Sequence, residues 1–279
     1  MNTSLISKYK SCPAQLTAAQ IEEYHENGFL AFTDVLNEQE VQKACAALTE
    51  LITLGVYHPD YLQHTLTDLY VQFERGYTPD LSAPMDELEL KVRKLMNYAR
   101  FNAHMNFLAT IQKRIQGITS SLLGPNPKLM MSMAMIKPPF IAGEKPWHQD
   151  TAYFSITPIN SVMGVWIALD PATVKNGCMH VLKGRHKDGP KKHHHTFDCE
   201  MLPDRYDASE STPVELPVGG AMFFHGLLPH QTPPNSSSDR RRALQFHYHA
   251  ANSKSVEREE YDRIFVEADG TPASCEAAR

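Results

Sequence analysis

Apolar residues recur at helical spacing in the first part of the chain. Thr17 and Gln20 form a capping-box pattern that predicts the start of a helix, and Gly28 is typical of its end. Residues 29–32 then predict a short strand, and Asn37 precedes a second helical pattern. The apolar face of this second helix comprises Val41, Ala44, Cys45, Leu48, Leu51 and Ile52. We expect both helices to pack on the outside of a sheet.

The pattern changes from helical to strand-like in the second part of the chain. A third helical spacing covers residues 101–123, and residues 90–98 alternate in part like a strand. From residue 129 onward, short apolar runs are separated by turns rich in Pro and Gly. These runs predict strands at residues 129–137, 152–156, 162–169, 178–182, 212–216, 220–225 and 241–250. So many short strands favour a mostly β fold with flanking α helices and a double-stranded β-helix core, the cupin-like jelly roll.

The chain has 279 residues, and we expect them to form a single domain over residues 1–279. Its expected parts are a loose arm (1–15), a mainly helical scaffold (16–123), the jelly-roll core (124–250) and a C-terminal tail (251–279). Residues 55–92 are rich in aromatic side chains and interrupted by prolines. This favours either a lid over the site or a surface excursion without a role.

Composition narrows the classes of partner and compartment. Hydrophobic residues are 42% and charged residues 21% of the chain, ordinary values for a globular protein, and the formal net charge is −5. We therefore expect neither nucleic acid nor an anionic membrane as a partner. No stretch approaches the roughly 18 apolar residues of a membrane span, and the N-terminus lacks a signal-peptide pattern. The scattered cysteines, without a CxxC pair, predict free thiols, a reducing compartment and a cytoplasmic protein.

His148 and Asp150 are the first candidates for chemistry. They lie two apart in a run that we expect to be extended, so both side chains project to the same side. One imidazole and one carboxylate can then bind a single cation. The best candidate for a second imidazole is His230, and His225, five residues earlier, is its rival. Two His and one carboxylate on one face of an octahedral metal leave three positions open, which is the facial triad of non-heme Fe(II) oxygenases.

Arg241 adds a group that can hold a carboxylate. It lies eleven residues after His230, at the start of a strand-like run, and the residues between the two are rich in Pro and Ser. A strand, a turn and a returning strand would bring Arg241 back beside the metal. A guanidinium pairs with a carboxylate through two hydrogen bonds and stays charged. The candidate metal ligands and Arg241 together therefore predict a 2-oxoglutarate site.

At these residues the sequence resembles the phytanoyl-CoA dioxygenase family of Fe(II)/2-oxoglutarate oxygenases. The likeness extends to Asn27-Gly-Phe-Leu, Gly164-Val-Trp-Ile-Ala-Leu, Asn176-Gly-Cys-Met and Gly184-Arg-His-Lys, and runs from about Leu16 to about His249. It implies Fe(II), 2-oxoglutarate and O2 as cofactor and cosubstrates. The implied reaction releases succinate and CO2 and hydroxylates a C–H bond of a small molecule. Halogenating relatives lack the carboxylate ligand, so the presence of Asp150 favours hydroxylation or a related oxidation.

The resemblance also implies roles for individual residues. His148, Asp150 and His230 would bind the iron. Arg241, assisted by the hydroxyl of Thr232, would bind the distal carboxylate of 2-oxoglutarate. The further implied cosubstrate contacts are Gln149, Trp166, Lys94 and Met133. Simpler alternatives stay open: Lys94 could be solvated, Trp166 and Met133 could be core packing, and a regular strand would turn Gln149 away from the metal ligands.

Residues 183–211 form a polar insertion that contains Arg185, Lys191, Lys192 and three consecutive histidines. We expect a solvated loop near the mouth of the site, where these cations would suit an anionic group on the small-molecule substrate. Consecutive side chains cannot all point at one ion, so the histidines do not predict a second metal site. The sequence does not indicate an oligomeric state.

Two other functions compete with the oxygenase. One is a non-catalytic, cupin-like protein that binds a metal or ligand, although a degenerate member should have lost one of its ligands and none is missing here. The other is a metal-dependent hydrolase with Zn(II) at the same residues. The chain has no GxSxG, P-loop, GxGxxG or HExxH pattern, which weakens nucleotide-dependent and other hydrolytic functions.

Overall fold

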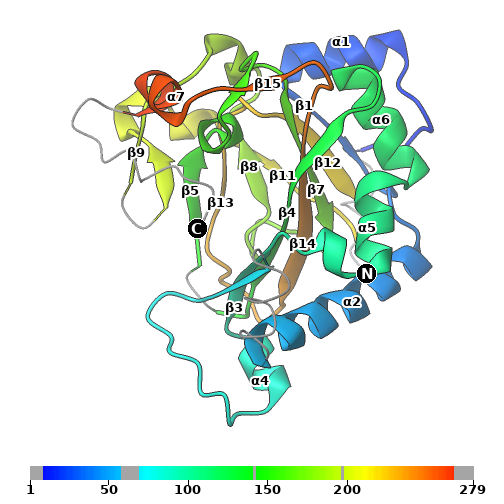
Figure 1. Ribbon diagram of the computed structural model, residues 1–279, viewed down its shortest axis with the longest axis vertical. Helices are drawn as coiled ribbons and strands as arrows, with labels where there is room; N and C mark the ends of the chain where they lie inside the picture. Colours follow the sequence, from blue (N-terminus) through cyan, green and yellow to red (C-terminus); the bar gives the residue numbers. More distant parts are fainter. Residues whose placement is uncertain (1–8, 58–68, 141–142, 196–197, 267–279) are drawn as a thin grey trace.

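The computed structural model of the protein describes residues 9–57, 69–140, 143–195 and 198–266, and its largest element is a seven-stranded sheet (Figure 1). In spatial order its strands are β1 (Phe29–Phe32), β12 (Ala221–His225), β7 (Val162–Ala168), β14 (Arg241–His249), β4 (Lys128–Lys137), β3 (Val92–Met96) and β2 (Tyr70–Phe73). A four-stranded sheet contains β11 (Thr212–Val214), β8 (Met179–Val181), β13 (His230–Thr232) and β5 (Lys145–His148). Two pairs complete the strands: β9 (His193–His195) with β10 (Cys199–Met201), and β6 (Ile156–Thr157) with β15 (Lys254–Ser255).

The two larger sheets pack face to face. Side chains alternate along each strand, so the larger sheet has one face toward the helices and one toward the smaller sheet. On β7, Met163, Val165 and Ile167 belong to the apolar core that the helices cover. Trp166 and Ala168, on the opposite face, pack in a second core with residues of β8 and β11. Figure 1 shows the four-stranded sheet beside the larger one. This sandwich with flanking helices confirms the predicted fold class.

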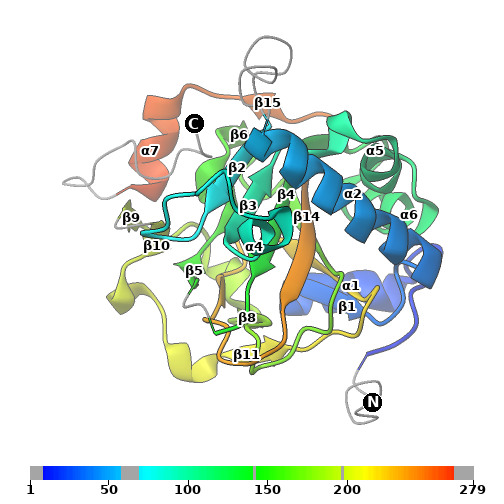
Figure 2. The same ribbon diagram turned by 90° about the horizontal axis from the view of Figure 1, so that it is seen from below.

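Within the described residues, five helices contribute to the outer core of the seven-stranded sheet: the short α4 (Met85–Glu89), through Leu88, and four longer helices (Figures 1 and 2). The four longer helices are α1 (Ala18–Asn27), α2 (Glu38–Tyr57), α5 (Ala103–Thr110) and α6 (Lys113–Leu123). The apolar face predicted for the second helix is buried in this core at Val41, Ala44, Leu48, Leu51 and Ile52. The expected position of the first two helices is therefore confirmed.

Side-chain caps determine where these two helices begin. Thr17 and Gln20 exchange hydrogen bonds between side chain and backbone in both directions. Asn37 and Glu40 do the same at the start of α2, with both distances at 2.9 Å. Each pair satisfies two N–H groups that a helix start would otherwise leave without partners. The predicted caps are thus present.

The helix expected over residues 101–123 is instead two helices. Gln112 takes a non-helical conformation (φ −55°, ψ 120°) between α5 and α6. Its side-chain oxygen accepts the N–H of Ile115 at 2.9 Å, and its amide donates to Val35 O at 3.2 Å. A buried glutamine therefore caps α6 in the middle of a continuous apolar spacing, which the spacing alone does not reveal.

Segments expected to be irregular contain regular elements. Residues 69–92 form β2 and the short helix α4 (Met85–Glu89), so the described part of the expected lid includes an edge of the larger sheet. Residues 58–68 lie outside the described part of the chain. The 183–211 insertion contains the β9–β10 pair, and the expected tail contains α7 (Arg258–Phe265).

Two further expectations are corrected. Within the expected loose arm, the Ser11 hydroxyl and the Cys12 N–H donate to the Asp34 carboxylate at 2.7 and 2.6 Å, so residues 9–15 are attached to the fold. Residues 152–156, expected as a strand, instead contain the end of the 3-10 helix η2 (Asp150–Tyr153) and the start of β6.

Two sequence-based expectations concern membranes and thiols. Among the described residues, no helix combines the length and apolar character needed to cross a bilayer. Cys12, Cys45 and Cys178 carry the expected free thiols. Cys199 corrects that expectation, because it is disulfide-bonded.

Candidate metal centre and adjoining cavity

Three buried side chains converge on one point between the sheets. Strands β5 and β13 are antiparallel neighbours in which His230 is the register partner of His148, so their rings lie 4.1 Å apart between centroids. Asp150 Oδ1 lies 3.2 Å from His148 Nε2 and 3.5 Å from His230 Nε2. One ligand atom from each residue falls within 4.8 Å of the others. The structure thus brings the predicted metal ligands together.

Asp150 reaches this point from a turn rather than from a strand. Strand β5 ends at His148, Gln149 is still extended, and Asp150 opens η2. The next residue anchors the turn, because Thr151 N donates to Gly226 O at 3.0 Å and Thr151 O accepts from the Tyr261 hydroxyl at 2.6 Å. One extended residue is enough to keep the carboxylate on the same side as the His148 ring.

Backbone carbonyls orient both imidazoles. Nδ1 of His148 lies 2.8 Å from Pro146 O, and Nδ1 of His230 lies 2.9 Å from Leu228 O. A proton on each Nδ1 leaves each Nε2 with a free lone pair directed at the common point, as metal-binding histidines require. Burial, helped by the neighbouring His230 and Lys145, lowers the pKa of His148 to about 3. That ring is therefore neutral at physiological pH.

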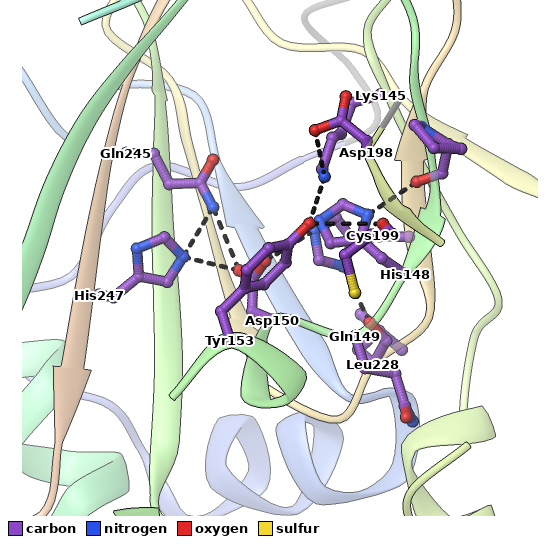
Figure 3. A network of polar contacts seen from close by, with 12 residues as sticks. Lys145, His148, Gln149, Asp150, Tyr153, Asp198, Cys199, Leu228, Gln245 and His247 are labelled. Atoms are coloured by element: carbon purple, nitrogen blue, oxygen red, sulfur yellow. Dashed lines mark hydrogen bonds and ion pairs between the residues drawn. The ribbon is translucent and has the colours of Figure 1, made fainter. Parts of the chain in front are cut away.

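The second oxygen of Asp150 is held by strand β14 (Figure 3). His247 Nε2 lies 2.8 Å and Gln245 Nε2 3.1 Å from Asp150 Oδ2. Burial would raise the pKa of Asp150, but the imidazoles around it hold that pKa well below its ordinary value. The carboxylate is therefore ionised and turned so that Oδ1 faces the candidate metal position.

The contact of His247 with Asp150 is a role that sequence reasoning missed. The available signal was the alternation of β14, which places Arg241, Gln245 and His247 on one face. The rival ligand His225 is excluded by the same rule on β12. Phe224 packs against His230, with ring centroids 4.8 Å apart, so His225 points the other way, toward His186.

A cavity of about 180 Å³ adjoins the candidate metal position. Four of the predicted cosubstrate residues line it: Lys94, Met133, Trp166 and Thr232. Arg241 is fully buried behind its wall, with its guanidinium 5.2 Å from the Trp166 ring and Nη1 3.4 Å from Met135 O. The cavity and the candidate metal ligands therefore form one site.

Several donors around this cavity have no acceptor among the described residues. They are Nε and Nη2 of Arg241, Oγ1 of Thr232 and Nε1 of Trp166. Burial lowers the pKa of Arg241 to about 10, which still leaves the guanidinium charged at neutral pH. Buried donors without partners cost free energy, so this set fits a carboxylate-bearing ligand such as 2-oxoglutarate.

The structure decides two of the open alternatives. Lys94 is not solvated: it is 8% exposed, and its Nζ lies 3.2 Å from Asp198 Oδ1. Burial, together with the neighbouring Lys145, lowers the pKa of Lys94 to about 7. Trp166 belongs to the core between the sheets and also lines the cavity, so both readings of that residue hold.

Gln149 does not lie where the family resemblance implied. Its amide nitrogen donates to Gly189 O at 3.0 Å and to Leu227 O at 2.7 Å, and its oxygen accepts the N–H of Lys191 at 2.7 Å. The side chain is fully buried among these loops and does not line the cavity. It lies between two metal-ligand candidates but points away from them, as an extended backbone dictates.

A cluster of charges on the cavity wall was not predicted. Asp198 accepts from Arg93 Nη2 at 2.5 Å, from Lys94 Nζ at 3.2 Å and from Lys145 Nζ at 3.1 Å. Lys145 Nζ also donates to the Tyr153 hydroxyl (Figure 3). These residues come from β3, β5, η2 and the β9–β10 connection, so no short motif could have revealed them.

The cations of the 183–211 insertion are used elsewhere. Lys192 Nζ donates to Arg263 O at 2.6 Å and to Val266 O at 2.8 Å, and Arg185 pairs with Glu210. The insertion is also not simply solvated, because His193 is fully buried and accepts the N–H of Gln149 at 3.0 Å. Arg185 and Lys192 therefore have partners within the chain, and their expected contact with an anionic substrate stays a prediction.

Solved structures with related chains share this fold. EvdO2 from Micromonospora carbonacea var. aurantiaca, complexed with 2-oxoglutarate, is 22% identical with a TM-score of 0.61, covering 95% of this chain and 98% of that chain. The epimerase SnoN from nogalamycin biosynthesis, in complex with Fe3+, α-ketoglutarate and nogalamycin RO, is 18% identical with a TM-score of 0.63, covering 91% and 93%. At these identities the likeness establishes the fold.

Curated relatives and a family profile establish the family. A phytanoyl-CoA dioxygenase domain-containing protein 1 homolog from Caenorhabditis briggsae is 26% identical over 265 residues, covering 81% of this chain and 88% of that protein. The peroxisomal phytanoyl-CoA dioxygenase of Rattus norvegicus is 28% identical over 253 residues, covering 86% and 70%. The profile of the family described as phytanoyl-CoA dioxygenase (PhyH) matches residues 24–243. Because that match spans most of its length, this chain belongs to the phytanoyl-CoA dioxygenase family.

Proposed function

We propose that the protein is an Fe(II)- and 2-oxoglutarate-dependent dioxygenase that hydroxylates a C–H bond of a small molecule. The observation that carries this proposal is the convergence of His148, Asp150 and His230 beside a cavity backed by Arg241, whose Nε and Nη2 have no acceptor among the described residues. Two imidazoles and one carboxylate are the donor set of non-heme Fe(II) oxygenases. Family membership and the 2-oxoglutarate named with EvdO2 support the same cofactor and cosubstrate.

The chain's own residues would then hold and orient the reactants. His148, Asp150 and His230 would bind the iron through Nε2, Oδ1 and Nε2, the atoms that converge. When bound, Fe(II) would activate O2, the oxidant, and 2-oxoglutarate would supply two of the electrons that reduce O2 and be released as succinate and CO2. The backbone carbonyls behind both imidazoles, and His247 behind Asp150, keep these donors in place.

Arg241 would bind the distal carboxylate of 2-oxoglutarate. Its free Nε and Nη2 can donate to two carboxylate oxygens, and burial excludes competing water. The Thr232 hydroxyl and the Trp166 N–H, both without acceptors among the described residues, are further donors to the same ligand. Lys94 and Met133 complete the walls of the cavity.

Replacing Asp150 by alanine tests the ligand assignment. Asp150→Ala should abolish release of succinate from 2-oxoglutarate under Fe(II) and air, because one of three ligands is lost and two buried imidazoles remain without the carboxylate. Succinate is measured together with the oxidised product. Asp204→Ala, at an exposed position where Asp204 pairs with the neighbouring Arg205, is the matched control and should retain turnover. Full activity of Asp150→Ala would reject the proposed metal site.

Measuring the dependence of turnover on O2 and 2-oxoglutarate distinguishes the proposed oxygenase from the two rival functions. A hydrolase at the same ligands would turn over without O2 or 2-oxoglutarate, and a non-catalytic binding protein would bind metal without releasing succinate. Solved structures of the same fold include a carbocyclase, SnoK, and an epimerase, SnoN. Product analysis by mass is therefore needed, since hydroxylation alone adds one oxygen atom to the substrate.

A further inference from the structure

Thioether side chains line much of the cavity beside the candidate metal position. Of the 12 methionines in the chain, those on the cavity wall are Met96, Met131, Met133, Met135 and Met179. A thioether is soft and polarizable, and it takes up one oxygen atom to give methionine sulfoxide. The cavity in which the proposed function places an oxidation therefore carries groups that can themselves be oxidised.

The pairing of β4 with β14 determines where Met131 lies in this cavity. Arg241 begins β14 and pairs with Lys137, whereas His247, farther along the same face, pairs with Met131. Directly paired residues on neighbouring strands have their Cβ atoms about 5 Å apart. His247 Nε2 in turn lies 2.8 Å from Asp150 Oδ2 (Figure 3). Met131 is therefore adjacent to a side chain that contacts a candidate metal ligand.

The two ends of the cavity have different tasks in the proposed function. The end at Arg241 is assigned to 2-oxoglutarate, which leaves the end at His247 for the primary substrate. There, Met131 packs against the apolar cluster that contains Phe154, and the Phe154 and His247 rings lie 5.0 Å apart between centroids. When no substrate fills this end, the Met131 thioether is left facing the place where a substrate C–H bond would be oxidised.

We propose that Met131 is an internal oxygen acceptor, which is converted to methionine sulfoxide when O2 and 2-oxoglutarate are consumed without a primary substrate. One atom of O2 forms the S–O bond. The other enters the new carboxylate of succinate as the C1–C2 bond of 2-oxoglutarate breaks and CO2 leaves. The sulfur and 2-oxoglutarate each supply two of the four electrons that reduce O2. This inference rests on the proposed function, which supplies both co-reactants.

The modification would make turnover without substrate self-limiting. A sulfoxide is polar, whereas the Met131 thioether packs among apolar side chains. A polar oxygen without a hydrogen-bond partner is costly in such surroundings, so the substrate end of the cavity must rearrange around it. We therefore expect succinate release to slow as Met131 becomes oxidised, and to recover when methionine sulfoxide reductases restore the thioether.

Peptide mass spectrometry tests the modification independently of turnover. The Fe(II)-loaded protein is incubated with 2-oxoglutarate and air, with catalase present to remove free peroxide, and fragment masses locate each added oxygen atom. Met130 is the matched internal control, because it is half-buried like Met131 but does not line the cavity. We expect Met131 to be oxidised about tenfold or more faster than Met130, which corresponds to ~1.4 kcal/mol in the barrier.

Two omissions show whether the oxygen comes from the proposed reaction. Leaving out 2-oxoglutarate should leave Met131 unmodified, and so should replacing Fe(II) by Zn(II), which has no redox chemistry. Equal oxidation of Met130 and Met131 would overturn the proposal, because it would indicate a diffusing oxidant. Oxidation of Met131 that persists without 2-oxoglutarate would overturn it as well.

Substitution by leucine tests the self-limiting role. Met131→Leu nearly conserves the side-chain volume but removes the sulfur, so the decline of succinate release with time should be lost. Met130→Leu is the control and should decline as the wild type does. A decline of the same size in Met131→Leu and in the wild type would contradict the role assigned to Met131.

Succinate and sulfoxide, measured on the same samples, separate this inference from the proposed function. Succinate release with Met131 unmodified would reject the internal acceptor and keep the oxygenase. Absence of both products would reject the oxygenase and, with it, the inference. Both products together, with Met130 unmodified, are the expected result.

Discussion

Arg241 and Arg242 are neighbours on β14 with opposite surroundings. Arg241 is fully buried behind the cavity, with two nitrogens lacking acceptors among the described residues. Arg242 points to the other face, where Nε and Nη2 bond both carboxylate oxygens of Asp170 at 2.9 and 2.8 Å. Strand alternation alone separates the two roles, because consecutive side chains face opposite sides of a sheet.

This pair gives a matched test of cosubstrate binding. Arg241→Met should raise the Kd for 2-oxoglutarate roughly 30-fold or more, because losing one partner of a buried charge pair costs about 2 kcal/mol or more. Arg242→Met removes the same group from the opposite face and should leave that Kd unchanged. Both are measured by anaerobic titration of the Fe(II)-loaded protein. Equal effects of the two substitutions would place the carboxylate clamp elsewhere.

His247 gives a test of metal affinity that does not depend on turnover. Its Nε2 holds Asp150 Oδ2 at 2.8 Å, whereas the nearby His249 bonds the backbone oxygen of Ala250 through Nδ1. His247→Phe should raise the Kd for Co(II) about 10- to 100-fold, the usual effect of losing a partner behind a metal ligand. The His249→Phe variant is the control. Unchanged Co(II) affinity in His247→Phe would mean that Asp150 needs no such support.

At the scale of elements, register decides the metal centre. Strands β5 and β13 pair so that His148 faces His230, and the irregularity after His230 places Thr232 opposite Lys145. A shift of one residue in either strand would turn the imidazole of that strand to the other face of the sheet and separate it from its partner. The helices contribute by a different route: they cover the outer face of the larger sheet and leave its inner face for the cavity.

Replacing a residue that caps a helix tests how that element is stabilised. The Asn102 side chain accepts the N–H groups of His104 and Met105 at 3.0 and 3.1 Å and so begins α5. Asn102→Ala should lower the free energy of unfolding by about 1 kcal/mol. Asn106→Ala, at an exposed position within the same helix, should be neutral or slightly stabilising because alanine favours helices. Urea denaturation measures both, and similar losses in the two variants would contradict the assigned cap.

At the scale of the whole molecule, burial keeps several histidines neutral. His193 is fully buried, its Nδ1 lies 2.8 Å from Lys191 O, and its Nε2 accepts the N–H of Gln149. Protonation of Nε2 would remove that acceptor from a backbone N–H beside the metal ligands. Burial accordingly lowers the pKa of His193 to about 3. The neutral ring links the 183–211 insertion to the site.

The pH dependence of stability follows from this shift. In the unfolded chain a histidine takes up a proton near pH 6.5, while folded His193 resists it down to about pH 3. The contribution is therefore fully present above pH 6.5 and is lost as the pH falls toward 3, at about 1.4 kcal/mol per unit. His193→Gln should flatten this slope in urea denaturation of the metal-free protein. The adjacent His194, paired with Glu200, gives the control variant His194→Gln. An identical slope in wild type and His193→Gln would contradict the assignment.

Sequence patterns over a few residues predicted correctly those features of the backbone that depend on neighbouring residues. The caps at Thr17 and Asn37 and the strand formed by residues 162–168 follow from hydrogen bonds or alternation within a few residues. The pairing of His148 with Asp150 is of the same kind, because one extended residue between them sets both directions. Gln112 shows the limit: its side chain breaks an apolar spacing by bonding Val35, far away in the chain.

By itself, the sequence determined the chemical types at the candidate site and the direction of each side chain relative to its neighbours. The motif around His148, the alternation that begins at Arg241 and the strand-rich second half were sufficient for that. Only the tertiary structure decided that His230 and not His225 joins His148, that Gln149 serves the loops, and that Asp198 gathers lysines from separate strands. The reason is physical: side-chain direction is set by the local backbone, whereas the choice of partner depends on strand register and burial, which the whole fold sets together.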